Sequence, residues 1–449
     1  MKLPKDFETY FRERWETEAV DALISGLQSE PSVSIRLNPS RLPLDAEPEG
    51  ADGHVPWCPE GIYLQSRPAF TADPLLHAGA YYVQEASSMF LAHVLRTIFH
   101  SSLSIAGCLD LCAAPGGKST LLRSLLPDDC LLVSNEPVRA RAQVLAENMA
   151  KWGHPNVLVT QAYAADIAEA LRRGGRKKGG GRARFDLILA DVPCSGEGMM
   201  RKEEEAVRQW SPAFVAECAA LQRRIVADIW PTLRDGGYLI YSTCTFNPEE
   251  DEENVEWIAS ELGADIIPIP IDHTWNICGD MRRPTPSVGH PSRNGGEMHC
   301  TVFELQRGSS PNGGAGRGSS TSTLPFCHFL PGEVRGEGFF CALLRKHGEE
   351  ESVVKNADFT DCFAALNILP TDLLDSDEAL QVELSLDDAI RYLQREALVL
   401  PGATPRGIVQ VCYRGQRLGL VKNLGTRANN LYPKEWRIRT SHIIPHSLF

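Results

Sequence analysis

The middle of the chain alternates short apolar runs with longer segments in which apolar and polar residues recur at helical spacing. This alternation is typical of a parallel sheet covered by helices. The apolar runs predict strands at 104–111, 130–135, 157–160, 185–191 and 237–242. The segments between them predict helices at 117–126, 138–152 and 214–230, and a further helix from about 249. We therefore expect a doubly wound, Rossmann-like α/β domain whose ligands lie at the carboxyl ends of the strands.

Shorter patterns precede this domain. Residues 7–27 have the spacing of an amphipathic helix, 32–40 that of a strand, and 54–65 that of a turn-rich strand pair. The patterns predict a small α+β module at 1–90, followed by the α/β domain at 91–348.

Charge is distributed unevenly along the 449 residues, which carry a net charge of −13. Residues 351–400 hold eleven acids against three basic residues, which predicts an acidic linker at 349–384. From 401 onward eight basic residues face one acid, so we expect a basic domain at 385–449. The stretch RRGGRKKGGGRAR at 172–184 predicts a mobile loop, either a solvated insertion or a contact to a phosphate backbone.

The thirteen cysteines are odd in number and include no Cys-x-x-Cys pair. They predict reduced thiols and not a disulfide framework or a zinc ribbon. No apolar run approaches the roughly 18 residues of a membrane span, and the first residues do not resemble an export signal. We expect a soluble protein of the cytoplasm, without a membrane or metal partner.

A glycine-containing turn, DLCAAPGGKST at 110–120, follows the first predicted strand. Pro115, Gly116 and Gly117 allow a tight turn and a close approach of the backbone to a small ligand. The turn is not a nucleoside triphosphate loop, because Cys112 stands where that motif requires glycine. The dinucleotide fingerprint G-x-G-x-x-G is also missing at this strand.

Acidic residues follow the second and third predicted strands. Glu136 stands where this architecture grips a ribose diol, and Asp166 could meet an adenine amino group. Each residue taken singly could instead belong to a solvated helix start or loop. Together with the glycine turn they predict an adenosine-binding site.

Cysteines stand at the ends of the fourth and fifth predicted strands, Cys194 in ADVPCSGEGMMRK and Cys244 in YSTCTFNPEEDEEN. A buried cysteine usually packs as a small apolar side chain, which is our interpretation of Cys108 and Cys112. Two cysteines at the ends of adjacent strands instead favour a role in catalysis.

These motifs resemble those of the Nol/Nop/Sun family of S-adenosyl-L-methionine-dependent RNA cytosine-5 methyltransferases, and YYVQEASSM at 81–89 resembles the motif that precedes them. The similarity spans about 34–346. The tail GIVQVCYRGQRLGLVKN…NNLYPKEWRIR resembles the PUA-like domain of the bacterial RsmF-like branch, which methylates ribosomal RNA. The resemblance implies RNA-binding modules at both ends of a methyltransferase domain.

The resemblance also implies roles for individual residues. Cys244 would be the nucleophile, Asp191 the group at cytosine nitrogen 3, and Cys194 the residue that assists removal of the carbon-5 proton and product release. The implied cofactor contacts are Cys112, Ala113, Ala114, Pro115, Gly116, Gly117, Lys118, Glu136, Arg141, Asp166 and Asp191. The candidate RNA contacts are Arg201, Lys202, Lys422 and Arg427.

The chemistry explains the need for thiols and an acid. Carbon 5 of cytosine is a poor nucleophile, and thiolate attack at carbon 6 with protonation at nitrogen 3 makes it reactive towards a sulfonium methyl group. From the residues alone the two cysteines could be exchanged, since DNA cytosine-5 methyltransferases use the cysteine of a Pro-Cys pair.

Two further features receive a structural interpretation. The acidic run 249–253 follows Asn247 and Pro248, a helix-start pattern in which carboxylates complement the helix dipole, so we do not expect a metal site. His328 receives no catalytic role, because the residues after it depart from the family pattern.

The sequence thus predicts a monomeric methyltransferase acting on ribosomal RNA, 16S rRNA in particular, or on a small ribosomal subunit. The target base would be unstacked into the pocket of Asp191, Cys194 and Cys244. A tRNA cytosine-5 methyltransferase and a non-catalytic RNA-binding assembly factor are the alternatives.

Overall fold

The computed structural model describes residues 2–100, 105–174, 183–282, 321–348, 359–363, 366–372, 374, 376, 379–439 and 446–449. Most of the expected basic loop (175–182) lies outside these residues, as do residues 283–320. Among the described helices, none is long and apolar enough to cross a membrane.

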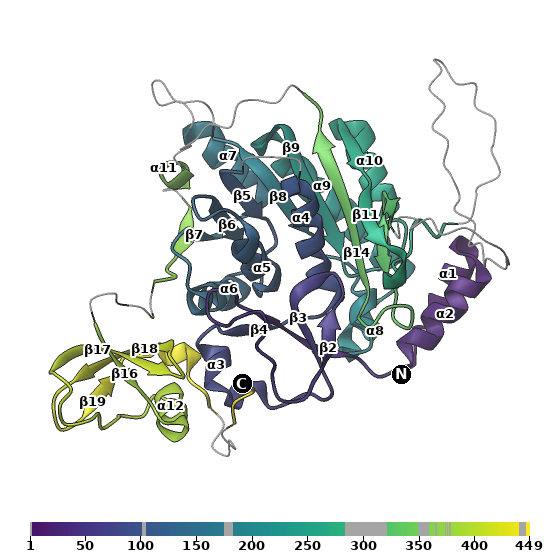
Figure 1. The fold of residues 1–449 in the computed structure, drawn as a ribbon. Coiled ribbons are helices and arrows are strands. Elements are labelled where there is room, and N and C mark those ends of the chain that lie inside the picture. Colours follow the sequence, from purple (N-terminus) through teal and green to yellow (C-terminus); the bar gives the residue numbers. More distant parts are fainter. Residues whose placement is uncertain are drawn as a thin grey trace, which may run out of the picture.

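A 9-stranded mixed sheet forms the centre of the molecule (Figure 1), in the order β10-β14-β9-β8-β5-β6-β7-β15 with β13 paired to β14. Its parallel strands are β5 (Gly107–Asp110), β6 (Leu131–Asn135), β7 (Val157–Gln161), β8 (Phe185–Asp191) and β9 (Leu233–Thr243). Its antiparallel strands are β10 (Ala264–Ile267), β13 (Cys327–Phe329), β14 (Phe339–Lys346) and β15 (Asn367–Leu369).

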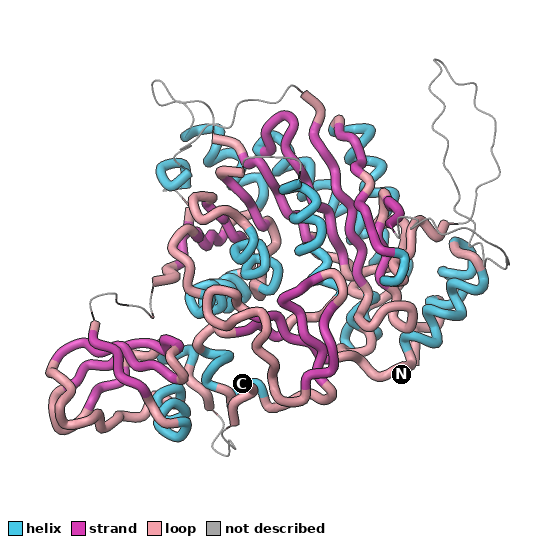
Figure 2. The backbone as a smooth tube through the Cα atoms, viewed as in Figure 1, coloured by secondary structure: helices cyan, strands magenta, loops and turns pink. Residues whose placement is uncertain are grey.

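Helices cover both faces of this sheet (Figure 2), each face closing its own apolar core. One layer contains α4 (Leu91–His100), α5 (Gly117–Leu125) and α6 (Arg139–Trp152). The other contains α7 (Ala164–Gly174), α9 (Pro212–Ile229), α10 (Glu252–Leu262) and α11 (Phe359–Phe363). From β5 the chain first builds the β6 and β7 side and then crosses to β8 and β9. The crevice for a ligand therefore lies at the β5/β8 switch point.

The first residues form three helices and a 4-stranded sheet of order β2-β3-β1-β4. These elements are α1 (Phe7–Arg14), α2 (Thr17–Leu27), β1 (Val33–Leu37), β2 (Ala51–Val55), β3 (Cys58–Leu64), α3 (Pro74–His77) and β4 (Tyr81–Val83). The prediction of one helix over 7–27 is wrong. Trp15 is extended, with φ −114° and ψ 161°, and its indole is buried in a core shared with Trp210 and Phe246. The extended backbone of Trp15 forms an isolated β-bridge with Arg282, and this separates α1 from α2.

The last residues form a second 4-stranded sheet, lower left in Figure 1, made of β16 (Leu380–Glu383), β17 (Gly407–Tyr413), β18 (Gln416–Asn423) and β19 (Ala428–Asn430), with α12 (Leu386–Leu393) beside it. This C-terminal domain packs on the N-terminal module, because Leu75 and Tyr81 share a core with Leu418 and Tyr432. The segment expected to be an acidic linker is also part of the α/β domain, because it supplies α11 to a helix layer and β15 to the central sheet.

The expected strands and helices of the α/β domain are present, with ends shifted by a few residues. The helix expected from about 249 is α10, which begins at Glu252. A turn precedes it, in which Asn247 Oδ1 accepts the backbone N–H of Glu250 at 2.9 Å. Glu250, Asp251 and Glu252 are buried, which the helix-start pattern did not predict.

Candidate active site

The glycine turn connects the end of β5 to α5. Gly116 caps the helix with a φ of +116°, a conformation that residues with a Cβ rarely adopt. Ser119 Oγ donates a hydrogen bond of 2.6 Å to Asp110 Oδ2, which fixes the first turn of α5 to the strand end. Burial raises the pKa of Asp110 to about 7. The positive end of α5 thus faces the crevice at the switch point.

Glu136 lies beside this turn, at the end of β6. Its side chain is buried, and Oε1 accepts the N–H of Val138 at 2.9 Å. Arg141 Nη2 lies 3.4 Å from Glu136 Oε2 and donates to the Ala114 carbonyl at 3.1 Å. Arg141 therefore joins the glycine turn to the acid after the second parallel strand. Asp166 lies farther along, exposed in the first turn of α7, where Oδ2 accepts the N–H of Tyr163 at 3.4 Å.

A lysine–aspartate pair joins the first turn of α5 to the end of β8. Lys118 Nζ donates to Asp191 Oδ2 at 2.8 Å, and Ser242 Oγ at the end of β9 donates to Asp191 Oδ1 at 2.8 Å. Asp191 is thus oriented by one group in the first turn of α5 and one at the end of β9, and it remains partly exposed. A carboxyl group held in this way can meet a polar atom of a ligand.

The two strand-end cysteines meet in space. Cys194 Sγ and Cys244 Sγ lie 3.0 Å apart, within hydrogen-bond distance, and both side chains are partly exposed. The loops that carry them are also joined by their backbones, since Gly198 N donates to the Cys244 carbonyl at 2.8 Å. The hydrogen bond to Cys244 and burial raise the pKa of Cys194 well above its usual value.

Four buried carboxyl groups lie in the segments that follow the two cysteines. One of them was not singled out in the sequence, and the other three were interpreted only as part of a helix start. The four are Glu197, Glu250, Asp251 and Glu252. Burial raises the pKa of Glu197 to about 8 and raises the pKa of Glu250 and of Asp251. Glu252 lies 3.0 Å from Nε2 of the buried His328, which gives that histidine a structural contact. The only hint in the sequence was the density of acids close to two cysteines.

Comparison with known proteins assigns the three parts of the chain. The model of the 16S rRNA methyltransferase RsmB/F family matches 105–276. The N-terminal domain of 16S rRNA methyltransferase RsmF matches 3–86, and the methyltransferase RsmF PUA domain matches 379–438. The chain belongs to the RsmB/F family of methyltransferases.

Curated relatives agree with this assignment, and solved structures share the fold. Ribosomal RNA small subunit methyltransferase F of Cronobacter sakazakii is 28% identical over 96% of both chains. The Pectobacterium carotovorum protein of that name is 33% identical over 58% of this chain and 53% of its own. NSun6 from Pyrococcus horikoshii shares the fold, with a TM-score of 0.52 and 19% identity over 77% of this chain and 99% of that chain. A methyltransferase homologue from the same organism gives 0.51 and 22%, over 76% and 94%.

Two of the expected RNA contacts of this RsmB/F-family chain are bound within the protein. Arg201 Nε donates to Glu337 Oε2 at 2.7 Å, and its side chain is only 4% exposed. Its other nitrogens bond Ser29 Oγ and the Gly336 carbonyl. Lys202 Nζ lies 3.1 Å from Glu337 Oε1 but is 31% exposed. Arg201 therefore fastens α2 to the loop before β14, because its guanidinium is occupied there.

The other two expected contacts lie on the PUA domain. Lys422 is exposed on β18, and Arg427 is exposed in the turn between β18 and β19. Their backbones are close, because β18 and β19 pair Lys422 with Asn429. Both side chains are therefore accessible to a polyanion.

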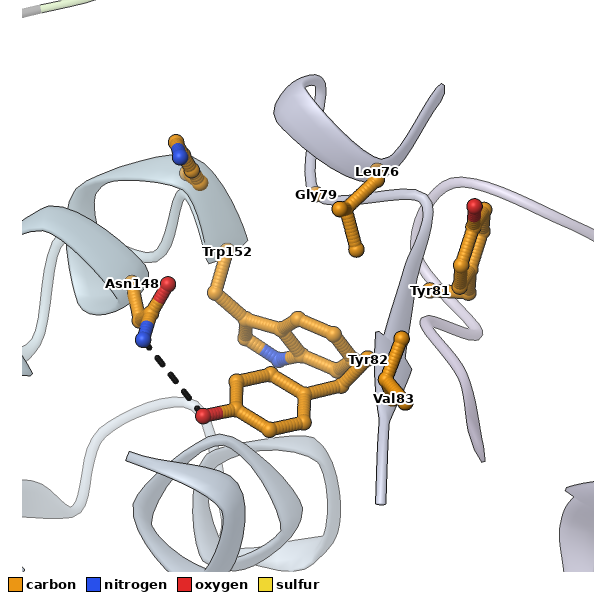
Figure 3. A pocket seen from close by; sticks show the side chains of 8 residues that line it. Leu76, Gly79, Tyr81, Tyr82, Val83, Asn148 and Trp152 are labelled. Atoms are coloured by element: carbon orange, nitrogen blue, oxygen red, sulfur yellow. Dashed lines mark hydrogen bonds between the residues drawn. The ribbon is translucent and has the colours of Figure 1, made fainter. Parts of the chain in front are cut away.

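A small pocket lies behind the glycine turn, between β4 and α6 (Figure 3). The rings of Tyr82 and Trp152 line it together with Asn148. Asn148 Nδ2 donates to the Pro115 carbonyl at 2.8 Å and to Tyr82 Oη at 3.4 Å, so the pocket wall supports the turn.

Within the described residues, no group of His, Cys, Asp or Glu side chains could hold a metal ion.

Proposed function

We propose that this protein transfers a methyl group from S-adenosyl-L-methionine to carbon 5 of a cytosine in the ribosomal RNA of the small subunit, 16S rRNA. The observation that carries the proposal is the meeting of Cys194 and Cys244, 3.0 Å apart, at the sheet edge that also presents Asp191. A covalent cysteine mechanism needs this combination of thiols and a carboxyl group. The family assignment supports RNA as the substrate.

The residues at the β5/β8 crevice fit the cofactor. Glu136 presents a buried carboxylate at the end of β6, where ribose hydroxyls would bind, and Gly116 leaves room for close approach of a ligand to the turn. The methionine moiety would lie near Lys118 and Asp191. The further cofactor contacts are Cys112, Ala113, Ala114, Pro115, Gly117, Arg141 and, at the adenine, Asp166. When bound, S-adenosyl-L-methionine supplies the methyl group on a sulfonium centre.

The protein's own groups would activate the base. The Cys244 thiolate adds to carbon 6 while Asp191 holds a proton at nitrogen 3, which makes carbon 5 nucleophilic. After methylation, Cys194 assists removal of the carbon-5 proton, and the bond between carbon 6 and Cys244 breaks. Both thiols lie at the same edge of the sheet, so their positions do not distinguish the nucleophile from the assisting residue. The choice of Cys244 as nucleophile follows the family resemblance.

The flanking modules would hold the RNA. Lys422 and Arg427 would bind phosphates on the exposed face of the PUA domain. The target cytosine must leave its stack to reach the cysteines. Binding of the surrounding RNA by both modules would offset that cost.

The direct test uses methyl-labelled S-adenosyl-L-methionine with small ribosomal subunits from cells that lack the protein. Naked 16S rRNA and tRNA serve as parallel substrates, and 5-methylcytosine is mapped at nucleotide resolution. We expect one labelled cytosine in the small-subunit rRNA. Label confined to tRNA would contradict the proposed substrate, and no label on any RNA would contradict the proposed reaction.

A further inference from the structure

The two cysteine-bearing loops exchange hydrogen bonds through a pair of buried glutamates. Glu197 belongs to the loop that carries Cys194, yet its Oε2 accepts two backbone N–H groups of the other loop. These are Phe246 N at 2.7 Å and Asn247 N at 3.1 Å. Both donors follow Cys244 closely, so Glu197 grips the loop of the proposed nucleophile.

Glu250 makes the reciprocal contact. It belongs to the loop after Cys244, and its Oε2 accepts Ser195 N, the residue after Cys194, at 3.0 Å. Gln222 Nε2 on α9 donates 2.6 Å to the same oxygen and 2.9 Å to the Pro193 carbonyl. Glu250 and Gln222 therefore hold the backbone on both sides of Cys194.

Asn247 joins the two glutamates. Its Nδ2 donates to Glu197 Oε1 at 3.0 Å and to Glu250 Oε1 at 2.8 Å. Trp210 Nε1 on the loop before α9 completes the shell of Glu197 with a 2.8 Å bond to Oε1. All these contacts bring N–H donors to the glutamate oxygens. The donors favour the ionised form of each carboxyl group and so oppose burial, which raises the pKa of both glutamates.

The hydrogen bonds between the two loops lie close to the thiols. Each glutamate grips the backbone within three residues of the opposite thiol. Further links at this level are the backbone bond from Gly198 N to the Cys244 carbonyl, the contact between the sulfur atoms, and the 3.5 Å bond from Asn247 Nδ2 to Ser195 Oγ. Loss of a carboxylate would free one thiol while leaving the strands β8 and β9 paired.

We propose that Glu197 and Glu250 are positioning residues, which hold Cys244 and Cys194 respectively at the separation that catalysis requires. The inference rests on the proposed function, because it assigns separate steps to the two thiols. Glu197 then supports the attack of Cys244 on the base, whereas Glu250 supports the release step that Cys194 assists.

The test compares Glu197→Gln with Glu250→Gln. Glutamine keeps the shape of the glutamate side chain. Its amide NH₂ group, however, would face an N–H donor where the carboxylate oxygen accepts a hydrogen bond. Loosening Cys194 slows release, so Glu250→Gln should accumulate covalent enzyme–RNA adduct. Its kcat should fall by about tenfold to a hundredfold, with the RNA KM changed less than about twofold. Glu197→Gln should lose kcat to a similar extent but form less adduct than the wild type.

Glu253→Gln is the matched control, because Glu253 is exposed in the first turn of α10. It should behave as the wild type. If Glu250→Gln does not fold, Gln222→Met removes the hydrogen bonds that α9 donates to Glu250 and to the Pro193 carbonyl. This variant should also accumulate adduct, but in a smaller amount. Circular dichroism and thermal unfolding establish folding for every variant.

The outcomes separate the two proposals. A wild-type protein without methyl transfer would contradict the proposed function itself. An active wild type, with Glu197→Gln and Glu250→Gln both like the control, would contradict only the positioning role. Adduct and turnover that fall in equal proportion in both variants would also overturn it, because a general loss of active protein would give that result.

Discussion

The edge of the central sheet and the exposed face of the C-terminal domain use charge in opposite ways. At the sheet edge, Lys118, Asp191, Glu197 and Glu250 are each bound to other groups of the protein. On the C-terminal domain, Lys422 and Arg427 are exposed. Internal bonds fix atoms in place, which suits bond making and breaking. Exposed positive charge provides affinity that depends on salt and little on position.

This difference divides the work within one molecule. Changes at the sheet edge should act on kcat, since they displace or remove reacting groups. Changes on the C-terminal domain should act on the RNA KM and its salt dependence.

The largest effect should follow from removal of the thiols. Cys244→Ala should abolish both methyl transfer and covalent adduct, with a loss of kcat of at least about 10⁴-fold. Cys194→Ala should also stop turnover but trap the enzyme–RNA adduct, which resists denaturing electrophoresis. Cys218→Ala, on the buried side of α9, is the control and should remain active. Turnover by Cys244→Ala would show that the nucleophile is assigned wrongly.

An intermediate effect should follow from disruption of the lysine–aspartate pair. Asp191→Asn removes the group proposed for nitrogen 3, and Lys118→Met removes its 2.8 Å partner. We expect kcat to fall by about 10² to 10³-fold for Asp191→Asn and less for Lys118→Met, in single-turnover assays. Lys151→Met provides a control, because Lys151 pairs with Glu147 within α6. Equal activity of Asp191→Asn and the control would exclude the proposed proton-holding role.

The same contrast explains which parts of the site could be predicted. Cys194, Cys244 and Asp191 end parallel strands, and such ends meet at one edge of a sheet, so the pattern of the strands was enough to bring them together. The ends of Gly117–Leu125 and Phe185–Asp191 followed from local signals in the same way.

The remainder depends on contacts between distant segments. Burial of Glu197 and Glu250 requires Trp210, Gln222 and Asn247 to supply donors, and no local pattern records that arrangement. The family resemblance made Arg201 a candidate RNA contact, and Glu337, 136 residues away, binds it inside the protein. Glycine spacing and strand ends are local properties, whereas the partner of a charge is a property of the fold.

The smallest effect should follow from neutralising the C-terminal face. The double variant Lys422→Gln/Arg427→Gln should raise the RNA KM about threefold to tenfold at moderate salt and leave kcat unchanged. Because each lost phosphate contact removes about 0.7–0.9 from the slope of log affinity against log salt, that slope should fall by about one to two. Filter binding over a salt series measures it. Arg391→Gln is the matched control, since Arg391 lies in α12 of the same domain and is paired with Asp388 and Glu396. An unchanged slope would remove this face from the RNA interface, and a loss of kcat would break the proposed division between holding and chemistry.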